Sequence, residues 1–332
     1  MPSRSPKVVV LGGGTGSFML LQALKELTPR IAAVVNMCDD GGSTGVLRDE
    51  LGVLPPGDAR QCLVALSESP EIRDLFSYRF AAGSLSGQSL GNIILSGLEL
   101  QHGSFEEAVR VASAILRIKG KVLPVVLGDH KLVMRDGSAV VKGQETIRLH
   151  TINQSNARVS LEPYSTLNPK ADKAIREADI VVIAPGGLYW SLLPVFSVNG
   201  IAEALQSTRG QVVYISNLVN KPGQTPNWDV VDYIKKIEEY IGEGAIDVVI
   251  YNTTPISKDL LSKYAQDGEY PVQVTAERFD TVGSQFVGAP LVSETIYAQD
   301  TADKAVKRTL IRHDGWRVKT EVEKLLKANN PK

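Results

Sequence analysis

Several short loops of this sequence carry the residue types that bind phosphate groups or hard cations. The first loop, residues 12–16, holds four glycines and Thr15, a composition that lets backbone amides approach an anion closely. The second loop, residues 38–45, places the adjacent carboxylates of Asp39 and Asp40 among glycines. Carboxylate oxygens beside a phosphate site can hold a divalent cation such as Mg²⁺ or hydrogen-bond the hydroxyls of a sugar. An Asx turn or a helix cap remains the alternative for this acid pair.

The first loop matches neither of the two best-known phosphate-binding motifs. A Walker loop ends in Gly-Lys-Ser/Thr, and no lysine lies between Lys7 and Lys25. A Rossmann fingerprint that begins at Gly12 needs glycine or alanine at position 17, where Ser17 stands. Ser17 can instead cap the following helix or bond the same anion. A dinucleotide stays open as a ligand, because Asp39 can hold a ribose hydroxyl.

A turn at residues 54–60 adds the carboxylate of Asp58 and the guanidinium of Arg60 to the candidate binding groups. Two prolines and a glycine precede Asp58, so this residue is placed to cap the next helix. Arg60 falls in the first turn of that helix, where the helix dipole disfavours a cation, so an anionic partner would explain it. Arg48 follows the second loop and is expected to pair with its acids or with a ligand phosphate.

Residues 87–91 match the Gly-x-Ser-x-Gly pattern of a hydrolase nucleophile elbow. An elbow follows a buried strand, whereas the small residues of a loop, 81–86, precede Ser89 here. A serine hydrolase is therefore disfavoured. We expect instead a glycine-lined loop that contacts a ligand, or a tight start to the helix that contains Asn92.

The elements that must position these loops follow an alternating pattern. Runs of β-branched residues alternate with helical patterns, which is typical of a parallel sheet covered by helices on both faces. Strands are expected at residues 7–11, 31–37, 121–127, 179–184, 211–215 and 246–251. Helices are expected after the first loop and at residues 58–67, 71–80, 105–118, 169–178 and 229–241. We predict an α/β fold, a three-layer Rossmann-like parallel sheet, in a single domain over residues 1–332.

Residues 130–162 depart from this alternation. Two short extended runs flank Asp136-Gly137, which is a hairpin signal, and further extended residues follow. We expect a small β-rich excursion from the main sheet at this point.

Polar loops follow five of the expected strands, at residues 12–16, 38–45, 185–189, 216–217 and 252–254. Parallel strands place such loops along one edge of the sheet, where ligands bind at the switch point. Tyr189 and Trp190 come just after two glycines, and these aromatic side chains can face a base or a sugar ring. The loops together predict one binding crevice.

The composition excludes several classes of function. The 332 residues contain 36 basic and 37 acidic side chains, so a nucleic-acid partner, which needs excess Lys and Arg, is not expected. No apolar run approaches the roughly 18 residues of a membrane span, and the N-terminal apolar run is too short for a signal peptide. Cys38 and Cys62 form no Cys-x-x-Cys motif, and the four histidines have no zinc-ligand spacing. We expect a cytoplasmic protein without membrane insertion.

The motifs together resemble those of the YvcK-type gluconeogenesis factors, a branch of the CofD-like superfamily. The resemblance runs in the right order through residues 12–16, 39–45, 54–58, 78–80, 89–92, 185–189 and 217–225. It implies a cytoplasmic bacterial protein with a three-layer α/β fold that binds UDP-sugars such as UDP-N-acetylglucosamine. It also implies a link to gluconeogenic growth, cell shape and envelope synthesis. The CofD enzymes of the superfamily transfer a phospholactyl-type group from a guanylyl donor with the help of a divalent metal.

The sequence departs from the family pattern at several positions of this pocket. Gln88 stands where the family commonly has histidine, which removes a candidate acid or base. Residues 218–220 replace a common Met-Thr-Gln stretch, and Gly187 replaces a serine. These departures leave the ligand preference open.

We therefore predict a UDP-sugar-binding regulatory protein, with a Mg²⁺-dependent transferase of a phosphate-linked group as the alternative and a dinucleotide oxidoreductase as a weaker third candidate. The predicted ligand- and phosphate-binding residues are Gly12, Gly13, Gly14, Thr15, Gly16, Ser17, Asp39, Gly42, Ser43, Thr44, Arg48, Asp58, Arg60, Ser89, Asn92, Gly186, Gly187, Tyr189 and Asn217. Asp40 and Asp58 are the predicted catalytic residues if the protein is an enzyme, and Asp39 and Asp40 are the predicted Mg²⁺ ligands. A homodimer is the expected assembly.

Overall fold

The computed structural model describes residues 5–154, 156–294 and 311–329. The remaining parts of the predicted 1–332 domain lie outside the described residues. Within the described ranges, the main sheet has seven strands, all parallel, in the order β10-β9-β8-β7-β1-β2-β3. Its strands are β1 (Val8–Gly12), β2 (Ile31–Val35), β3 (Lys121–Pro124), β7 (Ile180–Ile183), β8 (Gln211–Ile215), β9 (Val248–Asn252) and β10 (Gln285–Ala289).

The central strands are buried on both faces, which explains their uninterrupted apolar runs. Every residue of β1, β2 and β7 is buried, and Val8 pairs with Ile31 on one side and with Ile180 on the other. Burial of both faces is expected where helices cover a parallel sheet on its two sides. The predicted α/β fold is confirmed.

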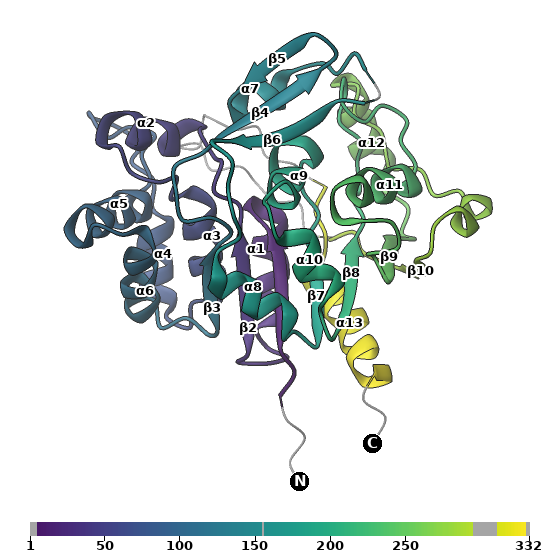
Figure 1. Ribbon diagram of the computed structural model, residues 1–332, viewed down its shortest axis with the longest axis horizontal. Helices are drawn as coiled ribbons and strands as arrows, with labels where there is room; N and C mark the ends of the chain where they lie inside the picture. Colours follow the sequence, from purple (N-terminus) through teal and green to yellow (C-terminus); the bar gives the residue numbers. More distant parts are fainter. Residues whose placement is uncertain (1–4, 155, 295–310, 330–332) are drawn as a thin grey trace.

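Helices cover the sheet in two groups (Figure 1). They are α1 (Gly14–Leu24), α2 (Gly42–Leu51), α3 (Gly57–Leu66), α4 (Pro70–Ser77), α5 (Leu90–His102), α6 (Phe105–Ile115), α8 (Pro169–Arg176), α9 (Leu193–Phe196), α10 (Ile201–Gln206), α11 (Val230–Ile241), α12 (Lys258–Gln266) and α13 (Gly315–Asn329), with a π-helical turn η1 (Leu188–Leu192) and a 3₁₀ turn η2 (Ala276–Thr281). α1 packs with α3 and α13, whereas α10 packs with α8 and α11. The two groups lie on opposite faces, because right-handed crossovers from β1 to β2 and from β7 to β8 run in opposite directions along the sheet.

The predicted β-rich excursion is a separate antiparallel sheet of β4 (Lys131–Asp136), β5 (Ala139–Lys142) and β6 (Arg158–Glu162), in the order β5-β4-β6. Asp136 pairs with Ala139 across the turn, which confirms the hairpin. The excursion also contains a short helix, α7 (Gln144–Leu149), which the sequence pattern did not predict. In Figure 1 this small sheet and α7 lie above the end of the main sheet that is opposite the chain termini.

Two predicted helix starts differ from the structure, and α2 lies where no helix was predicted. α2 begins at Gly42, so the end of the predicted second loop is helical, and Gly41 takes the N-cap position. α3 begins at Gly57 after Pro56, so Asp58 lies in its first turn and does not cap it. α1 begins at Gly14, which places Ser17 inside the helix and rules out the predicted cap. Consecutive glycines permit helix starts that side-chain capping patterns do not reveal. Among the described helices, none has the length and apolarity that crossing a membrane requires.

Candidate functional site

A cavity of about 920 Å³ lies at the carboxyl ends of β1, β2, β7 and β8, lined by the loops that follow these strands. The chain leaves β1 toward β2 and leaves β7 toward β8, so the connections diverge between β1 and β7. Open α/β sheets bind ligands at such a switch point. The volume of this cavity lies near the upper end of the range of small-molecule binding sites.

Three helices begin at this cavity. The first residues of α1, α2 and α3 line it, including Gly14, Gly42 and Asp58. At none of these three helices does the side chain of the N-cap residue accept a hydrogen bond from a backbone N–H of the first turn. The positive ends of three helix dipoles therefore favour a negatively charged group in this part of the cavity. At the start of α1 the Asp58 carboxylate already accepts the Gly14 N–H.

Glycine is required where the loops after β1 and β7 meet. A Cβ added to Gly16 would lie 1.9 Å from the backbone oxygen of Pro185, and one added to Gly13 would lie 2.1 Å from Asp58 Oδ2. Any larger residue would push these segments apart. Asn217 holds the same region from β8: its Nδ2 donates to the Gly186 carbonyl at 2.8 Å, and its Oδ1 accepts the Gly186 N–H at 3.4 Å. Asn217 therefore positions the glycines of the third loop.

Asp39 and Asp58 present two carboxylates to the cavity. Asp39 accepts the Gly41 backbone N–H at 3.2 Å, and burial raises its pKa. Burial also raises the pKa of Asp58 to about 8, and the charge of Asp39 adds to this shift. A cation held between them would favour both ionised forms, so this oxygen donor set fits a hard divalent ion that keeps most of its waters. Among the described residues no group of three or more His, Cys, Asp or Glu side chains is close enough to hold a metal.

Asp40 has a different task from its neighbour. Its Oδ2 accepts the Gln144 N–H at 2.7 Å and its Oδ1 accepts the Glu145 N–H at 2.8 Å, so both oxygens cap the start of α7. Asp40 does not line the cavity. The geometry therefore favours Asp39 and Asp58, rather than Asp40, as the acids that face a ligand or a cation.

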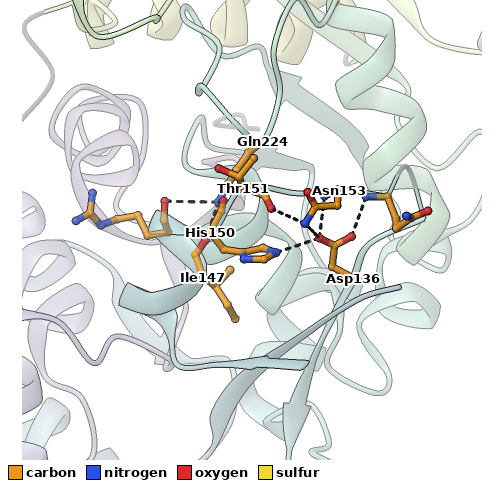
Figure 2. A network of polar contacts seen from close by, with 8 residues as sticks. Asp136, Ile147, His150, Thr151, Asn153 and Gln224 are labelled. Carbon is orange, nitrogen blue, oxygen red and sulfur yellow. Dashed lines mark hydrogen bonds and ion pairs between the residues drawn. The ribbon is translucent and has the colours of Figure 1, made fainter. Parts of the chain in front are cut away.

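The end of α7 is held from the other side of the cavity. Figure 2 shows Gln224, from the loop after β8, beside the last residues of this helix: its Nε2 donates to the carbonyls of Ile147 at 2.6 Å and His150 at 3.2 Å. Asp136 fixes the chain that follows α7, because its Oδ2 accepts His150 Nε2 at 3.0 Å and the Asn153 N–H at 2.8 Å. α7 is thus tied at both ends over the cavity, which Gln144, Glu145 and Arg148 help to line.

Most predicted site residues lie around this one cavity. Those that line it are Gly13, Gly14, Thr15, Gly16, Asp39, Gly42, Ser43, Thr44, Asp58, Arg60, Asn92, Gly186, Gly187 and Asn217. Arg60 is buried among them, and its Nε donates to Asn92 Oδ1 at 2.8 Å. Their binding roles remain predictions.

The other predicted ligand-binding residues do not line the cavity. They are Gly12, Ser17, Arg48, Ser89 and Tyr189. Arg48 donates to the Asp129 carboxylate and to the His130 carbonyl at 2.7 Å. Tyr189 is buried in the core, with the Lys236 ammonium 5.9 Å from its ring centre. Of the two aromatic residues expected to face a ligand, only Trp190 lines the cavity. The loop after β9 does not line it either, because the Asn252 side chain bonds to the backbone of Thr254 and Leu291.

Ser89 takes the N-cap position of α5 and follows a loop rather than a strand, which agrees with the rejection of a nucleophile elbow. Its hydroxyl is buried without a partner.

Several lining residues were not predicted from the sequence. They are Gln144, Glu145, Arg148, Asn220, Lys221, Gln224, Thr225, Tyr233, Lys263, Tyr264, Asp267, Glu269, Arg312 and His313. Only residues 217–225 carried a signal, the motif of the family resemblance. The others come from helices and a distant segment that no local pattern connects with the glycine loops.

Three comparisons place the chain among known proteins. A family model described as 2-phospho-L-lactate transferase CofD matches residues 8–292. A protein of Bacillus subtilis named gluconeogenesis factor is 37% identical over 329 residues, which cover 98% of this chain and 99% of the relative. A gluconeogenesis factor of Listeria innocua is 39% identical over 313 residues, covering 92% of this chain and 95% of the relative.

A crystal structure of a Bacillus halodurans protein has a similar fold. It superposes with a TM-score of 0.87 at 35% sequence identity, and the match covers 96% of this chain and 100% of that one. The similarity therefore extends over almost the whole chain in both sequence and structure.

Proposed function

The chain belongs to the CofD family, and from that premise we propose that its cavity binds a nucleotide-linked sugar, such as UDP-N-acetylglucosamine. In this proposal the protein is a regulator of gluconeogenic growth, cell shape and envelope synthesis. The gluconeogenesis factors of Bacillus subtilis and Listeria innocua, which it resembles along most of its length, support the link with gluconeogenesis.

One arrangement supports the proposal most directly. α1, α2 and α3 begin side by side at the cavity, around glycines that leave no room for side chains. A diphosphate placed there would meet backbone amides and helix dipoles rather than a cluster of lysines. Gln224 and His313 line the same cavity, and its volume of about 920 Å³ has room for a nucleoside and a sugar besides the diphosphate.

Calorimetry with UDP-glucose, UDP-N-acetylglucosamine, GTP and NAD tests the proposal. We expect micromolar affinity for a UDP-sugar, roughly 8 kcal/mol of binding free energy. Binding of NAD alone would favour the dinucleotide oxidoreductase instead. The absence of binding to both UDP-sugars at millimolar concentration would overturn the proposal.

A second candidate function is supported by the Asp39 and Asp58 pair. In a transferase, an acceptor hydroxyl would form a bond to the donor phosphorus, the nucleotide would leave, and the hydroxyl proton would pass to a carboxylate. Asp58 suits that last step, because it lines the cavity and burial raises its pKa, which makes the ionised carboxylate a stronger base. Mg²⁺, when bound, would neutralise charge on the transferred phosphate.

Release of nucleotide from a nucleotide-linked donor separates the two candidates. The transferase predicts release that needs both Mg²⁺ and an acceptor and that disappears in Asp58→Asn. The regulator predicts tight binding with no release of nucleotide above the rate in buffer.

A cytoplasmic location, a homodimer and a single domain over residues 1–332 are further parts of the proposal. Cell fractionation tests the location, light scattering tests the dimer, and limited proteolysis tests the single domain.

A further inference from the structure

Gln224 lines the cavity, and the NH₂ group of its side-chain amide already donates hydrogen bonds. The side chain is buried, with 4% of its surface exposed, and its Nε2 faces the carbonyls of Ile147 and His150 at the end of α7 (Figure 2). All of these partners are acceptors, so only the NH₂ half of the amide can face them. The orientation of the amide is therefore fixed, and Oε1 is directed away from α7.

Gln224 Oε1 is a buried acceptor without a hydrogen-bond partner. Within the described part of the chain, the other buried polar atoms without partners belong to residues that do not line the cavity, namely Ser17, Asn36, Ser89, Ser96, Glu106 and Glu238. A buried acceptor that lacks a donor destabilises the protein unless something supplies one.

The polar neighbours of Gln224 on this wall are already occupied. Tyr233 Oη lies 2.9 Å from Asn220 Oδ1 and 3.0 Å from Thr225 Oγ1, and Thr225 Oγ1 also accepts the Lys221 N–H at 2.9 Å. Asn220 Nδ2 donates to the Trp228 carbonyl at 2.9 Å. These polar groups bond to one another and to the backbone, so we infer that the donor for Gln224 Oε1 comes from the cavity.

We propose that Gln224 Oε1 accepts a hydrogen bond from an N–H or O–H group of the ligand, which makes Gln224 a specificity-determining residue of this site. A group with acceptors only, such as a carboxylate or a phosphate, is disfavoured at this position because it would repel Oε1. The inference rests on the proposed function. A UDP-sugar offers donors of this kind at three places: the imide N–H of uracil, the hydroxyls of the ribose, and the hydroxyl or amide N–H groups of the sugar.

Two substitutions separate the halves of the amide. Gln224→Lys keeps a donor for the carbonyls of α7 and removes the acceptor, whereas Gln224→Glu keeps the acceptor and removes the donor. Gln206→Lys is the matched control, because Gln206 Nε2 donates to the Ile241 carbonyl at 2.7 Å at the end of α11, and this residue does not line the cavity.

Calorimetry is carried out with UDP, its 3-methyluridine analogue, UDP-glucose and UDP-N-acetylglucosamine. Gln224→Lys is expected to weaken binding about tenfold, but only for ligands that bring the donor. A loss that spares the 3-methyl analogue identifies the imide, and a loss confined to the two sugar-bearing ligands identifies the sugar. A loss that all four ligands share and that 2′,3′-dideoxy-UDP does not show identifies the ribose hydroxyls. Gln224→Glu, which breaks only the contact with α7, is expected to weaken all four ligands alike, and Gln206→Lys none of them.

No loss in Gln224→Lys, or a uniform loss that 2′,3′-dideoxy-UDP shares, while the wild-type protein binds a UDP-sugar, would overturn the inference and leave the proposed function standing. A wild-type protein that binds none of the four ligands would overturn the proposed function and this inference with it.

Discussion

Asp58 and Asp39 lie on the same wall of the cavity, and burial together with the charge of Asp39 raises the pKa of Asp58 to about 8. The two carboxylates come from different helix starts, α3 and the segment before α2. The positive helix ends favour a negatively charged group such as a phosphate. The two neighbouring carboxylates favour a bound proton or a cation.

The raised pKa of Asp58 predicts a loss of stability as the pH rises. The folded protein holds this proton up to about pH 8, whereas the unfolded chain releases it near 4, so the free energy of unfolding falls between these values. The slope from this group approaches about 1.4 kcal/mol per pH unit. Asp58→Asn should therefore gain stability relative to wild type at pH 8 and not at pH 4, measured by urea denaturation. An equal difference at both pH values would contradict the assignment.

Mg²⁺ should stabilise the protein through the same carboxylates. We expect about 5 mM Mg²⁺ to raise the Tm of the protein more at pH 8 than at pH 5, because the two carboxyl groups must be ionised to bind the cation. The effect should disappear in Asp39→Asn and Asp58→Asn. Asp172→Asn, which removes a surface acid paired with Arg176, is the control and should keep the full shift.

His313 predicts the opposite pH dependence. Burial lowers its pKa to about 4, and its Nε2 lies 2.9 Å from the Ser216 carbonyl oxygen. The unfolded chain binds a proton near pH 6.5 and the folded chain does not, so this group's contribution to stability is lost as the pH falls from about 6.5 to about 4. His313→Gln should lose less stability over this window than wild type in urea denaturation. The comparison with the variant isolates this effect from that of Asp58.

Gly16 should be intolerant of the smallest side chain. Gly16→Ala would place a Cβ 1.9 Å from the Pro185 backbone oxygen, so the loops after β1 and β7 must separate and affinity for a UDP-sugar should fall more than tenfold. Gly52→Ala is the matched control: it has a φ of +67° but open space around the new Cβ. It should cost about 1 kcal/mol of stability and leave affinity unchanged. Equal affinities in the two variants, by calorimetry, would mean that the ligand lies elsewhere.

Asp40→Asn should loosen α7 without removing a cavity acid. The substitution replaces one of the two oxygens that accept the Gln144 and Glu145 N–H groups. We expect a loss of about 1 kcal/mol of stability and faster amide exchange in residues 144–149, measured by hydrogen–deuterium exchange. Unchanged exchange in α7 would show that Asp40 does not hold this helix.

The alternation of strands and helices could be predicted from the sequence, because it depends on local spacing. The buried runs of β1, β7 and β8 were found within two residues of their bounds, and the Asp136-Gly137 hairpin was found from its turn residues. The glycines after β1, β2 and β7 predicted the place of the site for the same reason: loops that follow parallel strands share one edge of the sheet.

The roles of individual acids and amides depended on the tertiary structure. Asp40 and Asp39 are adjacent in sequence, yet Asp40 caps a helix 104 residues further along the chain while Asp39 faces the cavity. Gln224 bonds to Ile147 across 77 residues. The sequence by itself determined that a parallel sheet carries glycine-rich loops along one edge. Only the folded chain decided which side chains face the cavity with free polar atoms, because hydrogen bonds between distant segments determine which polar atoms are already used.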